Sequence, residues 1–346
     1  MVTIWDVAKR SGYSTTTVSI VLNDAPLARY IPATTKRRIK KIADELSYRP
    51  NVFARSLRGK RSHTIGVIVF DISDPYCTQT LRGIENALYE SMYLPIVVDV
   101  QNDRERFNRY VQMLLERRVD GIIALANSLY LQSDLVGWVK KRVVPAIAIG
   151  RQLDPESVSS VVVDNQAGSR AALDYLYKLG HRKIAFIRGP KMLVDSNERW
   201  SGIESLAQEL DIDLSRKRVV QLKKLATDSQ EGRKAADELI RRDRNFTALL
   251  AFDDMTAFGA ISSLNHAGIR VPEDCSVIGF DDVAAAAFYN PPLTTIQQPM
   301  KTLGTMAVKI LMHATDAAVA KKRFSPVHRK ASPKLVVRES ARRLEP

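Results

Sequence analysis

Apolar residues recur at helical spacing through the first fifty residues, as in helices that bury one face. Thr3 followed by Asp6 is typical of a helix N-cap, and Gly12 can adopt the left-handed conformation that ends a helix. Ser14 is a second candidate N-cap. The pattern therefore predicts three short helices around one small core, at residues 4–11, 14–22 and 34–46.

From residue 63 onward the pattern changes, and short apolar runs alternate with amphipathic segments. Such alternation predicts parallel sheets whose strands are joined by right-handed helical crossovers, and two successive series predict two lobes. The expected strands are 64–70, 95–99, 121–126 and 146–149, followed by a second series at 158–163, 184–187, 219–222, 248–252 and 276–279. Helices are expected near 78–92, 104–117, 198–210, 230–242 and 255–267, with one more from residue 166.

A short segment separates the two patterns, because residues 48–50 end in a proline that breaks the third helix. Asn51 can cap a helix that is too short to be stable alone in water, so we expect it to form only when docked or paired. Leu57, which lies between Arg55 and Arg58, is suited to wedging between base steps in a minor groove while the arginines contact the backbone. The alternative is a plain linker between domains.

The formal charge of +14 is spread unevenly along the chain. Residues 1–62 contain 13 Lys and Arg against 4 Asp and Glu, and residues 321–346 contain 9 against 2, so the long middle segment is close to neutral. A basic head is the electrostatic footprint of a nucleic-acid-binding protein, because neutralised phosphates release their counterions. A solvated basic surface with no partner is the alternative.

The second predicted helix presents hydroxyl side chains in its first turn, because Val18 and Val21 are the residues that pack inward. Such side chains can bond base edges and contact thymine methyl groups in the major groove, although threonines that only cap and solvate a helix are common. Lys9, Arg10 and the run 36–38 add phosphate-type contacts. The candidate DNA-contacting residues of this region are Thr3, Ser14, Thr15, Thr16, Thr17, Ser19, Ile20 and Asn23.

The run Val7–Ser19, together with Leu46–Asn51 and Ala54–Leu57, resembles the head of the lactose-repressor (LacI/GalR) family of bacterial transcriptional regulators. Further motifs follow in the family's order, so the resemblance covers essentially the whole chain. It implies an all-α helix-turn-helix DNA-binding head followed by a two-lobed α/β body like that of a periplasmic binding protein. The further motifs are Asp164-Asn165, Leu179–Phe186, Phe252–Asp254, Ser276–Asp282, Pro292–Ile296 and Leu335–Ser340.

Two features depart from the family's pattern. Ile20 stands where many relatives carry arginine or histidine, and it can offer a base only an apolar contact. The loop from Asn23 to Pro32 is about three residues longer than usual, and Pro32 replaces a serine cap. Proline can still start a helix, because its missing N–H would be unpaired there in any case. We therefore expect the fold to be kept and the operator preference at one base pair to differ.

Polar side chains follow several predicted strands at their carboxyl ends, where open α/β sheets bind ligands. Asp71, Asp74 and Tyr76 follow the first strand, and Tyr76 could offer a stacking face. Helix capping and structural ion pairing are the alternatives for these side chains. By resemblance to the family, the residues expected to line an effector pocket are Tyr76, Arg151, Asp195, Arg199, Asp253 and Asp281.

The domain organisation follows from these patterns and the resemblance. The segment 294–299 and a helix near 302–318 are expected to return the chain to the first lobe, and 334–337 to add a last strand to the second. In the family the chain crosses between the lobes three times, which suits hinge motion around a ligand. The expected units are 1–50 (helix-turn-helix domain), 51–62 (hinge helix and linker) and 63–346 (effector-binding and dimerisation domain), with lobe 1 at about 63–163 plus 292–326 and lobe 2 at about 164–291 plus 327–346.

The sequence therefore predicts a sequence-specific, ligand-responsive DNA-binding repressor. A homodimer would bind a pseudo-palindromic double-stranded operator. The effector would be a small polar metabolite, either sugar-like or, as the purine-repressor-like Ser14–Ser19 run allows, a nucleobase. The effector's identity, the operator sequence and the choice between induction and corepression stay open.

Other classes of protein fit the sequence less well. A solute-binding protein of a transporter shares the two-lobed fold but would need an export signal and no DNA-binding head. An enzyme is not expected, because the chain has no P-loop, no GxSxG and no Gly-rich dinucleotide turn after a strand. Cys77 and Cys275 lie far apart and outside any metal-ligand spacing, so we expect neither a metal nor a cofactor. Without a secretory signal or a long apolar run, a cytoplasmic protein with no membrane partner is expected.

Overall fold

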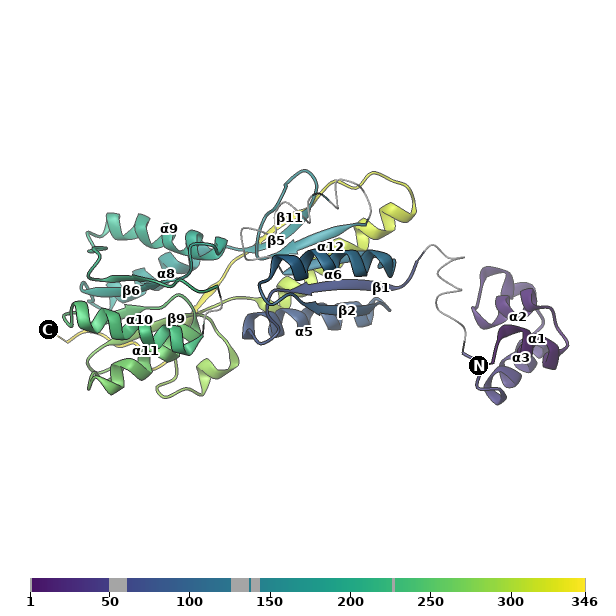
Figure 1. Cartoon of the computed structure of the whole chain (residues 1–346), viewed down its shortest axis with the longest axis horizontal. Helices are drawn as coiled ribbons and strands as arrows, with labels where there is room; N and C mark the ends of the chain where they lie inside the picture. The colour runs from purple at the N-terminus through teal and green to yellow at the C-terminus, as the bar shows by residue number, and fades with distance from the viewer. Residues whose placement is uncertain (1, 50–60, 126–136, 138–143, 226–227, 346) are drawn as a thin grey trace. The chain divides into compact units, whose positions relative to one another are not determined.

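The computed structural model describes residues 2–49, 61–125, 137, 144–225 and 228–345 of the chain. The chain divides into two compact units, Met1–His63 and Thr64–Pro346, which we call the head and the body (Figure 1). Each unit has a hydrophobic core of its own.

The head is helical, as the spacing of its apolar residues predicts. At the start of its first helix the backbone N–H of Thr3 donates to Asp6 Oδ2 at 2.7 Å, and at its end Gly12 adopts a left-handed conformation with φ 79°. Ser14 Oγ accepts from the backbone N–H of Thr17 at the start of the next helix. The described elements are α1 (Ile4–Ser11), α2 (Thr15–Leu22), the 3-10 turn η1 (Pro26–Tyr30) and α3 (Ala33–Glu45).

The core of the head is small and is built from all three α-helices. Val7 of α1, Val18 of α2 and Ile39 of α3 are each fully buried and belong to one cluster. Pro32 precedes α3 in an extended conformation, with φ −54° and ψ 146°, so the proline starts the helix without a side-chain cap. The extra loop residues form η1, which connects α2 to α3.

The first lobe of the body is built on a parallel sheet in the order β11-β5-β4-β3-β1-β2. One face packs against α5 and α12, and the other against α6. Figure 1 shows these helices around the sheet. The strands are β1 (Thr64–Val69), β2 (Leu94–Asp99), β3 (Gly121–Leu125), β4 (Ala146–Ile149), β5 (Ser159–Val163) and β11 (His328–Ala331), and the helices are α5 (Pro75–Glu90), α6 (Arg104–Glu116) and α12 (Met300–Val319).

The second lobe repeats the architecture with the strand order β12-β10-β9-β8-β6-β7. Its pairs are parallel except for β12, which runs antiparallel to β10. The strands are β6 (Ile184–Arg188), β7 (Val219–Gln221), β8 (Ala248–Leu250), β9 (Ser276–Asp281), β10 (Thr294–Gln297) and β12 (Lys334–Val336), and the helical segments are α8 (Asn165–Lys178), α9 (Val194–Glu209), α10 (Ser229–Arg242), α11 (Asp254–His266) and η3 (Ala284–Ala287).

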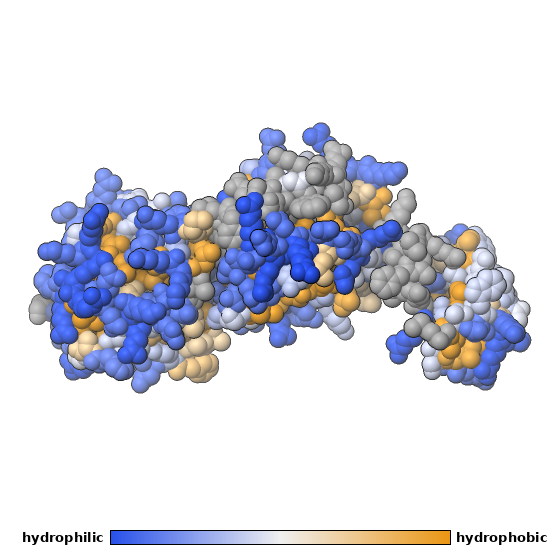
Figure 2. Space-filling view, in the orientation of Figure 1, coloured by the Kyte–Doolittle hydropathy of each residue, from blue (hydrophilic) through white to orange (hydrophobic). Residues whose placement is uncertain are grey.

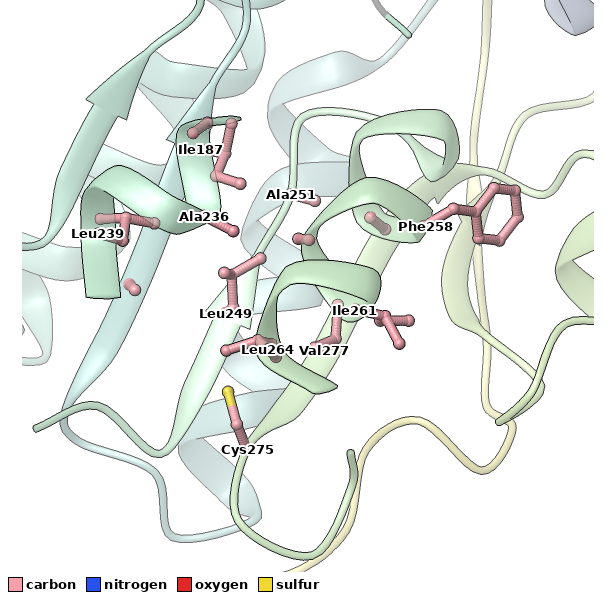
Figure 3. Packing of buried hydrophobic residues seen from close by; sticks show 14 of the residues in the cluster. Ile187, Ala236, Leu239, Leu249, Ala251, Phe258, Ile261, Leu264, Cys275 and Val277 are labelled. Atoms are coloured by element: carbon pink, nitrogen blue, oxygen red, sulfur yellow. The ribbon is translucent and has the colours of Figure 1, made fainter. Parts of the chain in front are cut away.

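Each face of the second sheet has a separate apolar cluster. Ala236 and Leu239 of α10 and Ile261 and Leu264 of α11 pack over one face, as Figure 3 shows. The side chains of α8 and α9, with Trp200 among them, cover the other face. The fold class expected from the sequence, a helical head and a two-lobed α/β body, is the fold observed.

The structure corrects the assignment of two strands. β10 was expected in the first lobe, but it pairs with β9 of the second sheet, where Ile296 is fully buried. β11 was expected in the second lobe, but it pairs with β5 of the first sheet. β5, which was counted with the second series of strands but placed within the expected bounds of lobe 1, belongs to the first sheet. The cause is that an apolar run identifies a strand without identifying its pairing partner, which is set by contacts distant in sequence.

These pairings place three crossings of the chain between the lobes. They lie between β5 and α8, between β10 and α12, and between β11 and β12. Strand carboxyl ends from both sheets, including those of β1, β4, β8 and β9, supply residues to one cavity. The fold thus brings together side chains that are far apart in the sequence.

The face of the body seen in Figure 2 is largely hydrophilic, with hydrophobic residues confined to patches. None of the helices in the described ranges combines the length and the apolar composition that crossing a bilayer requires.

Candidate functional site

The second helix of the head presents a polar face opposite its buried valines. Thr16 is exposed, and Thr15 and Ile20 are partly exposed, whereas Val18 and Val21 are buried. This alternation follows from the helical repeat, which places the two valines toward α1 and α3. Two hydroxyl groups and one apolar side chain are thus available on the outer face of α2.

Other predicted DNA-contacting residues also hold the head together. Ser14 and Thr17 bond each other through their hydroxyl groups at 2.9 Å at the start of α2. Asn23 Nδ2 donates to the carbonyl oxygen of Ser19 at 2.8 Å and contacts its hydroxyl at 3.2 Å. Thr3 donates its hydroxyl to Asp6 at 2.7 Å. These side chains therefore have a capping role as well as any role at DNA.

The expected hinge residues fall outside the part of the chain that the structure describes. They are Asn51, Arg55, Leu57 and Arg58, in the range 50–60. Their roles remain those predicted from the sequence.

The body contains a cavity of about 50 Å³ at the carboxyl ends of its strands. Four acidic side chains, one arginine, two amides and three aromatic rings contribute to its wall. The lining residues are Phe70, Asp74, Tyr76, Ile149, Gly150, Val163, Asn165, Leu193, Asp195, Arg199, Leu225, Phe252, Asp253, Asp281 and Gln298.

Arg199 of α9 is the cation of this cavity, and it is only 5% exposed. Its Nε donates to Asn165 Oδ1 at 3.1 Å, and its Nη1 donates to the carbonyl oxygen of Phe252 at 2.7 Å. The guanidinium lies 3.7 Å from the ring centroid of Phe280 and 4.7 Å from that of Phe252. Hydrogen bonds and ring contacts therefore fix its orientation.

Two carboxylates compete for the remaining face of Arg199. Its Nη2 lies 3.4 Å from Asp281 Oδ1 and 3.7 Å from Asp195 Oδ2. Asp281 Oδ1 also accepts from Gln298 Nε2 at 2.5 Å. Burial raises the pKa of the Asp281 carboxyl well above its ordinary value, although the charge of Arg199 opposes the shift. Burial likewise raises the pKa of Asp195.

Asp281 is held in an uncommon backbone conformation, with φ 120°. A non-glycine residue in this region is strained, and such strain persists only where the surrounding structure imposes it. Asp281 ends β9 at the cavity, so the strained residue is also the one whose carboxylate meets Arg199.

Two further carboxylates of the lining cap helices. Asp74 Oδ1 accepts from the backbone N–H of Tyr76 at the start of α5, and Asp253 Oδ1 accepts from that of Thr256 in α11. Burial raises the pKa of Asp74 to about 7, and nearby negative charges, including that of Asp253, add to the shift. The capping alternative thus holds for Asp253, although its side chain also lines the cavity.

The neighbouring acids of the family motifs have structural partners. Asp254 accepts from the hydroxyl of Thr295 at 2.5 Å and from the backbone N–H of Val283 at 2.9 Å. Asp282 pairs with Arg338 at 2.6 Å. Neither is among the residues that line the cavity.

Aromatic rings form the apolar part of the wall. Phe70 and Tyr76 stack with their centroids 6.3 Å apart and an interplanar angle of 21°. Within the second lobe, Gly189 after β6 leaves room for Phe252 after β8, because a Cβ at position 189 would lie 2.4 Å from the Phe252 ring. Burial raises the pKa of the Tyr76 hydroxyl, so it stays protonated near neutral pH. A ring face beside carboxylate and amide groups suits a small ligand with one apolar face and several polar groups.

Five of the six expected effector residues line the cavity, and Arg151 is not among them. Arg151 is buried, and burial lowers its pKa while the charge of Glu198 acts in the opposite direction. Its neighbour Gly150 contributes to the lining instead.

Several lining residues were not among the expected ones. Asn165 stands in a motif that marked the family, and Gln298 directly follows β10, so the rule that ligands meet strand carboxyl ends could have found both. Leu193 and Leu225 carry no signal in the sequence, because apolar loop residues are common. In the described ranges, no group of His, Cys, Asp and Glu has an arrangement that could hold a metal ion.

Comparison with protein families matches both parts of the chain. Residues 3–51 match the model described as bacterial regulatory proteins, lacI family, and residues 173–341 match the periplasmic binding protein-like domain. The HTH-type transcriptional repressor PurR of Aliivibrio fischeri (strain MJ11) is 33% identical over 90% of this chain and 91% of its own. PurR of Haemophilus influenzae (strain PittEE) is 32% identical over 99% of each chain.

Solved structures show the same similarity. The lac repressor dimer bound to operator and the anti-inducer ONPF has a TM-score of 0.86 and 26% identity, with 99% of each chain covered. The transcriptional regulator CelR in complex with cellobiose has a TM-score of 0.72 and 27% identity, with 98% of this chain and 100% of that chain covered. A LacI family regulator from Enterococcus faecium with bound ribose has a TM-score of 0.70 and 28% identity over 82% of this chain and 100% of its own.

Proposed function

The chain belongs to the lacI family of bacterial regulatory proteins, whose members are DNA-binding transcriptional repressors with an effector-binding body, and from that premise we propose how its two units act. Two heads of a homodimer bind the half-sites of a pseudo-palindromic operator. The cavity of the body binds a small polar metabolite, and binding changes the affinity of the heads for DNA.

In the head, we assign base reading to the outer face of α2. Thr15 and Thr16 offer hydroxyl groups to base edges, and Ile20 offers an apolar surface that fits the methyl group of thymine. Phosphate contacts from the capping residues and from neighbouring basic side chains fix the position of the helix. In the segment 51–58, Leu57 is the proposed wedge at the central base step, supported by Asn51, Arg55 and Arg58.

In the body, the effector we propose is an uncharged, sugar-like polyol. The observation that supports this most directly is the convergence of Asp74, Asp253 and Asp281 on one cavity with a single arginine and aromatic rings. Carboxylates accept hydrogen bonds from hydroxyl groups, and rings pack against the apolar face of a sugar. Four carboxylates against one cation disfavour phosphorylated metabolites. The relatives whose structures contain cellobiose and ribose agree with this class.

A nucleobase is the second candidate, and the similarity to PurR sequences favours it. A planar base could stack on Phe70 or Tyr76 and bond Asn165 and Gln298. Such a ligand would leave most of the carboxylates without donors, which is why the polyol ranks first.

Ligand entry is expected to need movement of the cavity wall. A cavity of about 50 Å³ is much smaller than the roughly 300 to 1,000 Å³ of typical ligand sites. The lining comes from both sheets, and the chain connects the lobes through the three crossings named above, so small rotations at these crossings would open the site. That change of angle is the proposed link between effector and head.

A homodimer is supported by apolar side chains exposed on the body. Tyr89 and Met92 at the end of α5 and Leu94 at the start of β2 are 75%, 82% and 64% exposed. β2 is an edge strand of the first sheet, and in the second lobe Phe288 is 89% exposed. Exposed apolar residues gathered on one segment are typical of a subunit interface.

A selection of random duplex DNA by the full chain tests the base-reading assignment. We expect an enriched pseudo-palindromic site, and Thr16→Ala should lower discrimination at one base pair in each half-site by about 1 kcal/mol, or about fivefold. Thr302→Ala, on the exposed face of α12, removes the same group and should change nothing. Enrichment of the same site with the same selectivity by Thr16→Ala would contradict the assignment.

A thermal-shift series tests the ligand class with named probes: ribose, cellobiose, ribose 5-phosphate and adenine. Stabilisation by a neutral sugar, lost in Asp281→Asn, is the expected outcome. Stabilisation by adenine alone would favour the nucleobase, and stabilisation by the phosphate ester would contradict the charge argument.

A further inference from the structure

The 3-10 turn η1 exposes side chains that the core of the head does not need. Leu27 and Tyr30 are 58% and 70% exposed, whereas Ala28 between them is 4% exposed and fixes the turn to the head. Large apolar and aromatic side chains held outward on a fixed turn suggest a surface that is covered by something else. We call residues 26–30 the η1 turn throughout.

The η1 turn lies beside the reading helix. The backbone N–H of Ala25 donates to the carbonyl oxygen of Ile20 at 3.1 Å, and η1 packs against α2. Ile20 is the partly exposed apolar residue on the outer face of α2. A duplex that meets this face at Ile20 therefore also comes close to the η1 turn.

The turn carries a pre-arranged arginine. The guanidinium of Arg29 lies 4.7 Å from the ring centroid of Tyr30, and its Nη2 donates to the Tyr30 hydroxyl at 2.7 Å. Holding a long side chain in one geometry lowers the conformational entropy lost on binding. Within the part of the head that the structure describes, no carboxylate forms an ion pair with Arg29, whereas Arg10 and Lys41 both approach Glu45.

The electrostatic surroundings point to a polyanion. Residues 25–43 contain six Lys and Arg and no Asp or Glu. An arginine with an aromatic neighbour in such a segment suits a phosphate backbone, because guanidinium bonds phosphate oxygens and the ring packs against the sugar. Since the segment belongs to a DNA-binding head, duplex DNA is the partner that this chemistry fits.

We propose that the η1 turn is an additional DNA-backbone contact, beside the bases that α2 reads. Arg29 bonds a phosphate oxygen, Tyr30 positions the guanidinium, and Leu27 packs against the neighbouring deoxyribose. The contact adds affinity without adding sequence preference, because phosphates are the same at every base pair. The proposal rests on the proposed function of the head and extends it to residues outside the helix-turn-helix face.

The test is a salt series with the full chain, the selected operator and an unrelated duplex of equal length. Arg29→Ala should weaken binding to both duplexes by the same factor and should reduce the slope of log affinity against log salt by about 0.9. Tyr30→Phe keeps the ring but removes the hydroxyl that holds Arg29, so a smaller loss of affinity with little change of slope is expected. Lys41→Ala, which removes an equal charge already next to Glu45, is the matched control.

The outcomes separate this proposal from the proposed function. If the unchanged protein selects no operator, the proposed function fails; if it does and Arg29→Ala alters the slope no more than Lys41→Ala, only the η1 contact is overturned. If Arg29→Ala loses affinity for the operator but not for the unrelated duplex, the η1 contact is also overturned, because Arg29 would then contact a base. Thermal unfolding checks the fold of each variant, and Arg29→Gln, which keeps most of the side chain, replaces any variant that unfolds. If Arg29→Ala changes the oligomeric state but not the slope of log affinity against log salt, the η1 turn contacts a second copy of the chain and the proposal is overturned.

Discussion

The head and the body place the side chains of their proposed sites in opposite ways. In the head, Thr16 and the η1 turn project from a surface above a core of few residues, and the surrounding charge is positive. In the body, Arg199 and Asp281 face inward, and carboxylates outnumber the cation. A long polyanion needs an exposed surface, whereas a small ligand needs an enclosed one.

The two regions also differ in how strongly these side chains destabilise the folded protein. The exposed threonines of α2 are solvated and cap or continue a helix, so they cost the head little. The carboxylates of the cavity are withdrawn from water, and burial raises the pKa of Asp74, Asp195 and Asp281. Changes in the cavity should therefore alter stability together with function, and changes on the reading face should alter function alone.

The largest effect is expected from the core of the head. Ile39→Ala removes a fully buried side chain from a small cluster and should lower the free energy of unfolding of the head by about 2 to 5 kcal/mol. Calorimetry of the full chain should show that the head unfolds at a lower temperature while the unfolding transition of the body is unchanged. An operator titration should show loss of binding.

Ile261→Ala, in the fully buried cluster between α10, α11 and the second sheet, is the matched change in the body. It should lower the body transition and leave that of the head in place. If either variant shifts both transitions equally, the two units do not fold independently and the comparison fails.

The next effect in size is expected from Arg199→Met. Removing the guanidinium leaves two buried carboxylates without their cation and should cost about 3 kcal/mol of body stability. Stabilisation by an effector should disappear as well, while affinity for operator in the absence of effector should stay nearly the same. Urea unfolding and operator titration measure the two quantities.

Arg170→Met is the control for Arg199→Met. Arg170 pairs with Glu209 at 3.0 Å on the surface, where solvent screens the pair, so little change in stability is expected. If both variants lose the same amount of stability, burial of Arg199 in the cavity is not the reason why its removal destabilises the body.

The smallest effect, taken over a single pH unit, is the change that Asp74 causes in body stability. The pKa of Asp74 is about 7 in the folded protein and near 4 when unfolded, so between these values the folded state keeps a proton that the unfolded chain has released. Stability should therefore fall as pH rises from 5 to 7, by up to about 1.4 kcal/mol per pH unit from this group. The raised pKa values of Asp195 and Asp281 act in the same direction.

Asp74→Asn keeps an oxygen to accept from the backbone N–H of Tyr76 but cannot ionise. Its unfolding free energy, measured from pH 5 to 8, should depend less steeply on pH than that of the unchanged protein. Identical slopes would show that folding does not raise the pKa of Asp74.

Much of the head could be predicted from the sequence, because its signals are local. The Thr3 and Ser14 caps, Gly12 and the inward valines each act within one or two helical turns, and α1, α2 and α3 lie within a residue or two of the expected bounds. The η1 turn was expected only as a longer loop, since five residues carry too little periodicity to predict a helical turn.

The cavity could be predicted only in part. The rule on strand carboxyl ends accounts for Asp253 and Asp281, which lie one and two residues after the predicted strands 248–252 and 276–279, and for Tyr76 in the segment after the strand 64–70. It could not show that Arg151 is not among the lining residues or that Phe252 becomes part of the wall, since both depend on packing between segments distant in sequence. The predicted lobes of β10 and β11 were wrong for the same reason.

The central claim is that the enclosed site of the body controls the exposed site of the head. The most direct test is the affinity of the full chain for its selected operator, with and without a small-molecule fraction of cell extract, for the unchanged protein and for Asp281→Asn. We expect equal affinities without extract, a change of about 5- to 150-fold with extract for the unchanged protein, and no change for Asp281→Asn. The same change in both proteins would contradict the claim.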